Sequence, residues 1–156
     1  MLRNTSLSWK GFDLSAIFAY SIGGYIYNRD ITMILHNGSL EGRDWSTEIL
    51  KRWTPENRYT DVPALSTTSN NWNSASTRFL QNNSYMRLKN LTLSYDLPKQ
   101  WISKLALSSV QVFVQGDNLF TIHRNQGLDP EQGITGITYY RYPAMRTISG
   151  GINLSF

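Results

Sequence analysis

The sequence predicts an all-β fold with about four long antiparallel strands. Three observations favour this fold class. Apolar and polar residues alternate over four long stretches, as they do in strands with one apolar and one polar face. Aromatic residues, which are enriched in strands, make up 13% of the chain. The connections between the stretches are long, short and long in turn.

Residues 6–22 predict the first strand, because apolar residues recur at every second position from Phe12 to Ile22 before Gly23 and Gly24 interrupt the pattern. Residues 84–97 predict the second strand, with a β-bulge at Lys89-Asn90 where the alternation changes phase.

Residues 107–122 and 144–156 predict the remaining two strands. A compact connection, with a helical turn that starts at Pro98, joins the second and third strands. Residues 123–143 form a loop punctuated by Gly and Pro.

Residues 23–83 read as a long loop, a feature that is usually functional. Within it, DWSTEILKRW predicts a short helix. Asp44 or Ser46 would cap this helix, and Ile49, Leu50 and Trp53 would face inward.

Long connections alternating with a short one are typical of transmembrane β-barrels, which have long extracellular loops and short periplasmic turns. The predicted strands are long enough to cross a membrane, since a tilted strand needs about 9–11 residues. Aromatic residues near the strand ends fit interfacial girdles; they are Trp9, Tyr20, Tyr85, Tyr95, Trp101 and Phe120. The chain ends on Phe156, although the last strand of a soluble sandwich could end in the same way.

Composition excludes several classes of function. The net charge of +4 comes from scattered residues, so no basic tract indicates nucleic-acid binding. The chain has no Cys and only two His, which disfavours a metal site. It contains neither an 18-residue apolar run nor a nucleophile or phosphate-binding motif. We therefore expect no enzyme activity and no cofactor.

Several stretches, in family order, resemble the C-terminal part of SusC/RagA-type TonB-linked outer-membrane transporters of Bacteroidetes. They are WKGFDLS, RWTPEN, SYMRLKNLTLSYDLP, VQVFVQGDNLFT, GLDPE, YPAMRT and GGINLSF. The resemblance implies that residues 1–156 are the C-terminal segment of a large transmembrane β-barrel of about 22 strands. The N-terminal plug domain would be absent, and the segment alone would not be transport-competent.

The resemblance also implies a function and partners. The whole protein would import oligosaccharides or peptides across the outer membrane of a Gram-negative cell, as a multi-pass barrel. It would work with a SusD-like surface lipoprotein and would use TonB through its missing N-terminal part. The barrel assembly machinery would recognise the terminal strand, for which we single out Ile152, Leu154 and Phe156.

The same reasoning assigns sides and contacts. If Phe156 ends at the periplasm, Met1 should lie at the periplasmic end too, and Arg87 and Lys89 should face the lumen or a rim. Loop aromatics could stack on sugar rings or hold apolar peptide side chains, or could instead pin the loop or join the girdle. These candidate substrate contacts are Trp45, Trp53, Tyr59, Trp72, Tyr139 and Tyr140.

Two alternatives stay open. Asp129 and Glu131 in GLDPE could serve acid–base chemistry or bind calcium, although Asp-Pro between glycines is first a turn signal. The whole chain could also be a soluble or surface-attached all-β carbohydrate-binding module, which predicts a monodisperse protein without detergent.

Overall fold

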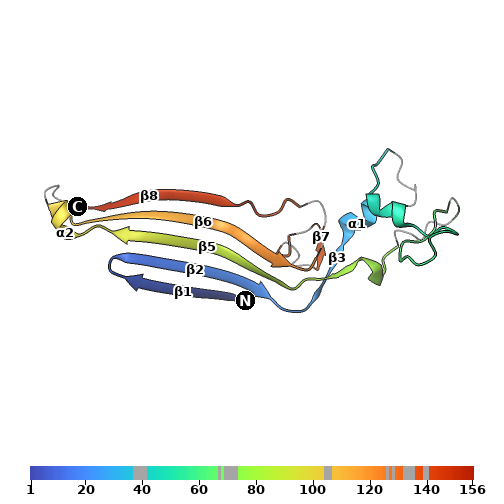
Figure 1. The fold of residues 1–156 in the computed structure, drawn as a ribbon, viewed down its shortest axis with the longest axis horizontal. Coiled ribbons are helices and arrows are strands. Elements are labelled where there is room, and N and C mark those ends of the chain that lie inside the picture. Colours follow the sequence, from blue (N-terminus) through green and yellow to red (C-terminus); the bar gives the residue numbers. More distant parts are fainter. Residues whose placement is uncertain are drawn as a thin grey trace. The chain divides into compact units, whose positions relative to one another are not determined.

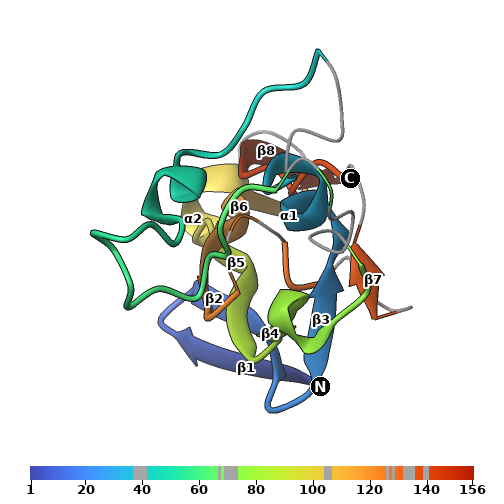
Figure 2. The ribbon, with the colours of Figure 1, turned by 90° about the vertical axis from the view of Figure 1, so that its right-hand side faces the viewer.

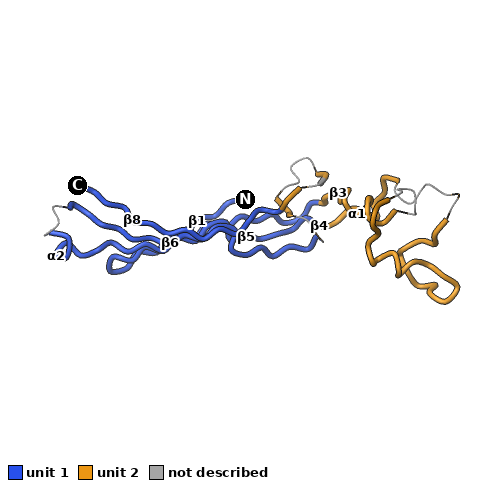
Figure 3. The backbone as a smooth tube through the Cα atoms, turned by 90° about the horizontal axis from the view of Figure 1, so that it is seen from above, with its two compact units in different colours: residues 1–24, 83–125, 143–156 blue, residues 25–82, 126–142 orange. Residues whose placement is uncertain are grey.

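The computed structural model describes residues 1–36, 42–66, 68, 74–103, 107–125, 127, 129–131, 136–138 and 141–156. The chain divides into two compact units (Figure 3). Residues 1–24, 83–125 and 143–156 form the first, here called the sheet unit. Residues 25–82 and 126–142 form the second, here called the loop unit.

The sheet unit is one antiparallel sheet of five strands in the order β1-β2-β5-β6-β8 (Figure 1). The strands are β1 (Leu2–Trp9), β2 (Phe12–Ser21), β5 (Tyr85–Asp96), β6 (Ser109–His123) and β8 (Thr147–Ser155). Seen from the side (Figure 2), these strands follow one another from β1 to β8 as a single layer. The all-β antiparallel prediction is confirmed.

The prediction of one strand over residues 6–22 is wrong, because Lys10 and Gly11 form a tight turn between β1 and β2. Both turn residues have positive φ, 48° and 86°, as in the two-residue hairpin turns whose twist suits flanking strands. Such a turn pairs Trp9 with Phe12 on one face. The apolar positions therefore change from odd to even numbers at the turn, which is the signal that the prediction overlooked.

The hairpin also places Met1 at a different end of the sheet from the one expected. The Met1 ammonium group donates to the Tyr20 carbonyl oxygen at 2.8 Å. Because β1 runs antiparallel to β2, Met1 lies at the opposite end of the sheet from the Lys10-Gly11 turn. Phe156 follows β8 at the same end as that turn, since Ser155 pairs with Ser109 at the start of β6. The expectation that Met1 and Phe156 share an end is therefore wrong.

The predicted β-bulge is present in β5. The register with β6 shifts between Leu88 and Asn90, where Lys89 is the extra residue. A short helix, α2 (Lys99–Ile102), follows with Pro98 as its N-cap residue, where the compact connection was expected. Among the described residues, no helix is both long and apolar enough to cross a bilayer.

The loop unit contains a small sheet, although the sequence read residues 23–83 as loop. Strand β3 (Tyr25–Asn28) pairs antiparallel with β4 (Leu80–Asn82) and parallel with β7 (Ile137–Thr138). Three short helices complete the described part, namely α1 (Arg29–Ile34), η1 (Thr47–Lys51) and η3 (Thr77–Phe79). Ile26 and Phe79 are fully buried and give this unit a core.

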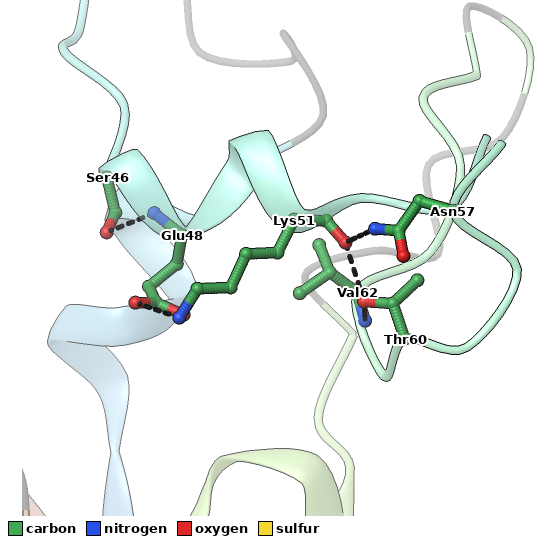
Figure 4. A network of polar contacts seen from close by, with 6 residues as sticks. All are labelled: Ser46, Glu48, Lys51, Asn57, Thr60 and Val62. Carbon is green, nitrogen blue, oxygen red and sulfur yellow. Dashed lines mark hydrogen bonds and ion pairs between the residues drawn. The ribbon is translucent and has the colours of Figure 1, made fainter.

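The helix predicted in DWSTEILKRW is the 3₁₀ helix η1, and the Ser46 hydroxyl caps it by accepting from the Glu48 N–H (Figure 4). Ile49 is buried with Val62. Leu50, however, is 72% exposed, so its predicted inward position is wrong. A 3₁₀ helix has three residues per turn, so a short one buries a single row of side chains.

The segment that follows η1 is held by polar contacts to Lys51, the last residue of this helix (Figure 4). The Lys51 carbonyl oxygen accepts from the Asn57 side-chain amide at 3.0 Å and from the Thr60 hydroxyl at 2.6 Å. Trp53, predicted to face inward with Leu50, is 43% exposed because its segment has left the helix. This correction leaves Trp53 accessible in the loop unit.

Candidate functional site: a two-faced sheet and an aromatic loop unit

One face of the five-stranded sheet is apolar. The register places, for example, Leu14, Leu93 and Val114 side by side across β2, β5 and β6. The members of this apolar face are Leu7, Trp9, Phe12, Leu14, Phe18, Tyr20, Met86, Leu88, Leu91, Leu93, Tyr95, Val110, Val112, Val114, Phe120, Ile122, Ile148, Ile152 and Leu154.

Much of the apolar face is exposed, even on the central strands. Leu93 is 42% exposed and Val114 49% exposed. Contiguous apolar surface of this kind is rare on soluble monomers and marks a surface that contacts protein or membrane. Alternation of an apolar outer face with a polar inner face is the pattern of strands in a transmembrane barrel.

The opposite face is polar and hydrogen-bonded across strands. The Asn153 amide on β8 donates to Gln111 on β6 at 3.2 Å, and Gln111 donates to the Asp96 carboxylate on β5 at 3.0 Å. Nearer the other end of the sheet, the Asn90 amide donates to the Asp117 carboxylate at 2.8 Å. Polar side chains therefore satisfy one another on this face, which suits a lumen rather than lipid.

Arg87 lies on the polar face, where its register partners are Ala19 and Thr121. It is only 4% exposed, and its Nε donates to the Thr121 hydroxyl at 2.8 Å. The expectation that Arg87 points away from lipid agrees with this position, because the register excludes the guanidinium from the apolar face.

Aromatic side chains gather where the apolar face ends near the Lys10-Gly11 turn. The Phe12 and Tyr95 rings lie 4.4 Å apart between centroids. Trp9 is 64% exposed in the same row.

Tyr85, which the sequence assigned to a girdle, pairs with Ser21 and therefore lies on the polar face. That assignment is wrong because the bulge at Lys89 moves Tyr85 to the other face.

The three residues singled out for barrel assembly continue the apolar face to its end. Ile152 pairs with Val112 and Leu154 with Val110. Phe156, just after β8, is 91% exposed. These positions leave all three side chains accessible to a partner protein or lipid.

The candidate aromatics of the loop unit differ in their surroundings. Trp45 is 41% exposed and meets the buried His36 ring edge-on, with 5.4 Å between centroids. Tyr59, in contrast, is fully exposed. Trp72, Tyr139 and Tyr140 lie outside the described residues. Trp45 therefore contributes to packing, whereas Tyr59 is available for contact without a structural role.

The loop unit also holds an open groove with a volume of about 680 Å³, which the sequence analysis did not anticipate. Its charged lining residues include Asp30, Arg43, Asp44 and Arg141, with Tyr142 beside them. These residues come from segments far apart in the chain, so no local motif could have indicated them. A lining with both acidic and basic groups suits a ligand that both donates and accepts hydrogen bonds.

The described part of GLDPE contains a turn at Pro130 and Glu131, the simpler of the two expectations. The buried Asp129 carboxylate accepts from the Glu131 backbone N–H at 3.0 Å. The carboxylate thus stabilises its own loop. Across the described ranges, no three His, Cys, Asp or Glu side chains are grouped as metal ligands.

Known proteins resemble this chain along nearly its whole length. It is 32% identical over 164 residues to TonB-dependent receptor P3 of Formosa agariphila, covering 98% of this chain and 16% of that protein. It is 28% identical to TonB-dependent receptor SusC of Bacteroides thetaiotaomicron, covering 97% of this chain and 14% of that protein. The chain thus spans about a sixth of the length of these relatives. No family model matches it.

Solved structures give the same result. The structure of the RagAB peptide transporter matches with a TM-score of 0.85 and 34% identity, over 98% of this chain and 17% of that one. The RagAB peptide importer in its open-open state also matches with a TM-score of 0.85 and 34% identity, over 98% of this chain and 16% of that one.

Proposed function

We propose that this chain, whose resemblance to TonB-dependent transporters of the SusC/RagA type is confirmed over 98% of its length, forms part of the wall of an outer-membrane importer. The observation that carries the proposal is the two-faced sheet. Its exposed apolar face suits lipid, and its hydrogen-bonded polar face suits the lumen of a barrel.

The cargo would be oligosaccharides or peptides. The name of one solved relative supports peptides, since it is a peptide transporter. The exposed aromatics and the mixed-charge groove of the loop unit could hold either class, because aromatic faces contact sugar C–H groups as well as apolar side chains. The chain would act in transport and not as an enzyme, without a cofactor.

The proposed partners belong to the whole protein. A SusD-like surface lipoprotein would meet the loop unit, and TonB would act through parts of the transporter outside this chain. The barrel assembly machinery would bind the terminal strand through Ile152, Leu154 and Phe156. The two outer strands, β1 and β8, would pair with further strands, because an unpaired strand edge cannot face lipid.

Uptake by cells that produce the full-length protein tests the proposal. Labelled oligopeptides and oligosaccharides are offered to wild-type cells and to a strain that lacks the protein, each with and without an uncoupler of the proton gradient. The proposal predicts that one class enters only when both the protein and the gradient are present. Uptake of both classes that is independent of the protein would contradict it.

Among the loop aromatics, Tyr59→Ala gives the cleanest test of substrate contact. Tyr59 is fully exposed, so its loss removes no packing. We expect slower uptake at limiting substrate, with unchanged protein in the outer membrane. Leu50→Ala is the matched control, because Leu50 is also exposed and apolar but not aromatic. Equal uptake by the two variants would remove Tyr59 from the proposed contacts.

A further inference from the structure

Lys10 occupies an unfavourable backbone position. Its φ of 48° lies in the left-handed region, where side chains other than Gly, Asn and Asp are disfavoured. The first residue of this hairpin turn is preferentially Asn, Asp or Gly. A lysine at this position lowers the stability of the turn. Backbone strain of this kind is often found at functional sites, so we infer a role for the Lys10 side chain.

The Lys10 side chain lies at the border of the apolar face. Its ammonium nitrogen is 5.0 Å from the centroid of the Trp9 ring. Trp9 belongs to the apolar face and is 64% exposed. The cation therefore lies beside the apolar face of the sheet.

A second cation and a second tryptophan lie at the same end of the sheet. The Asp96 N–H donates to the Gly11 carbonyl oxygen at 2.8 Å, which places the turn beside the start of the connection that carries α2. Lys99 begins α2, and Trp101 in the same helix is 65% exposed. Two lysines and two exposed tryptophans thus share this rim.

Two nearby carboxylates, those of Asp13 and Asp96, belong to the polar face. Asp13 accepts from the Ser8 hydroxyl. Asp96 accepts from the Gln111 amide at 3.0 Å. Both carboxylates therefore lie on the opposite face of the sheet from Trp9.

We propose that Lys10 and Lys99, flanked by Trp9 and Trp101, bind the phosphate groups of anionic phospholipids where the sheet leaves the membrane. The inference rests on the proposed function, since it requires the apolar face to lie in a bilayer. Ammonium groups bind phosphate as point charges, and tryptophan favours the headgroup level. Lysines beside an anionic membrane surface each add to the attraction.

The test uses the full-length protein in detergent, titrated with phosphatidylglycerol or phosphatidylcholine and followed by native mass spectrometry. The variant is Lys10→Asn with Lys99→Gln. Asn suits the turn better than Lys, so this variant removes the charge without weakening the hairpin. The matched control is Lys51→Gln with Arg58→Gln, which removes two cations from the loop unit.

We expect the variant to bind phosphatidylglycerol about 30-fold more weakly at low salt, from the contribution of two lysines. Binding of phosphatidylcholine should not change, and the control should behave as wild type. A Lys10→Arg, Lys99→Arg protein should keep the preference for phosphatidylglycerol. Unchanged phosphatidylglycerol affinity in the variant, or equal wild-type affinity for both lipids, would overturn the inference.

A separate measurement distinguishes this failure from failure of the proposed function. The wild-type protein is run on a gel with and without boiling. A band that shifts on heating, together with equal lipid binding by variant and wild type, refutes the lipid site alone. A wild-type protein that is absent from the outer membrane and does not shift refutes the proposed function and the lipid site together.

Discussion

At the scale of residues, the Lys10-Gly11 turn shows that two residues are enough to change the arrangement of the strands. Gly11 has a φ of 86°, and a Cβ atom there would stand 3.1 Å from the Asp96 carbonyl oxygen. The turn thus needs glycine both for its backbone angle and for the close approach of β5. Two residues convert one long predicted strand into two paired ones.

Gly11→Ala should therefore destabilise the full-length protein more than Gly23→Ala. Both glycines have positive φ, which costs a residue with a Cβ atom about 1–2 kcal/mol, but a Cβ at Gly23 would meet nothing within 4 Å. Urea unfolding of the protein in lipid vesicles measures the two midpoints. If the two variants unfold at the same midpoint, the close contact with Asp96 does not contribute.

At the scale of elements, the alternation of apolar and polar residues predicted those features that depend on neighbouring residues in the sequence. It indicated strands near residues 84–97, 107–122 and 144–156, where the structure has β5, β6 and β8. It also identified the apolar face, because the period of two fixes which residues share a side. The hairpin was not predicted, because the apolar positions change from odd to even numbers between Trp9 and Phe12 and this change was not interpreted as a turn.

The small sheet and the groove of the loop unit were not predicted, for a different reason. Strand β3 pairs with β4 and β7, which are far from it in sequence. Its groove gathers Asp30, Arg43 and Arg141 from separate segments. Such contacts depend on tertiary packing rather than on local pattern, so only single aromatics could be singled out from the sequence.

The two faces of β6 make opposite predictions for arginine. Val114→Arg should destabilise the protein in vesicles by about 2–4 kcal/mol, because an arginine near the midplane of the lipid face must be buried in hydrocarbon. Gln115→Arg is the matched control on the polar face, where Asp117 already accepts from Gln115. Denaturant unfolding compares them, and equal stability of both variants would show that Val114 does not face lipid.

The terminal strand carries a prediction about assembly. Phe156→Ala should lower the amount of full-length protein in the outer membrane several-fold, because its exposed ring is a proposed contact of the assembly machinery. Ser155→Ala is the control, since Ser155 lies on the polar face beside Ser109. Quantitative blots of membrane fractions compare the variants. Equal amounts of both would remove Phe156 from the assembly signal.

At the scale of the whole molecule, we propose that the sheet is part of a larger one. Its apolar face is exposed along all five strands, and β1 and β8 each have one unpaired edge within the described residues. Open edges and exposed apolar faces promote aggregation in water. A closed barrel in a membrane removes both problems at once.

The most direct test of this claim is a blot of outer-membrane fractions with an antibody to residues 122–143, with and without boiling. We predict a single band far above 17.9 kDa, the mass of this chain, that shifts on heating as folded barrels do. A soluble band at 17.9 kDa that does not shift would mean that the chain folds alone in water, and would contradict the assignment of its sheet to a transporter wall.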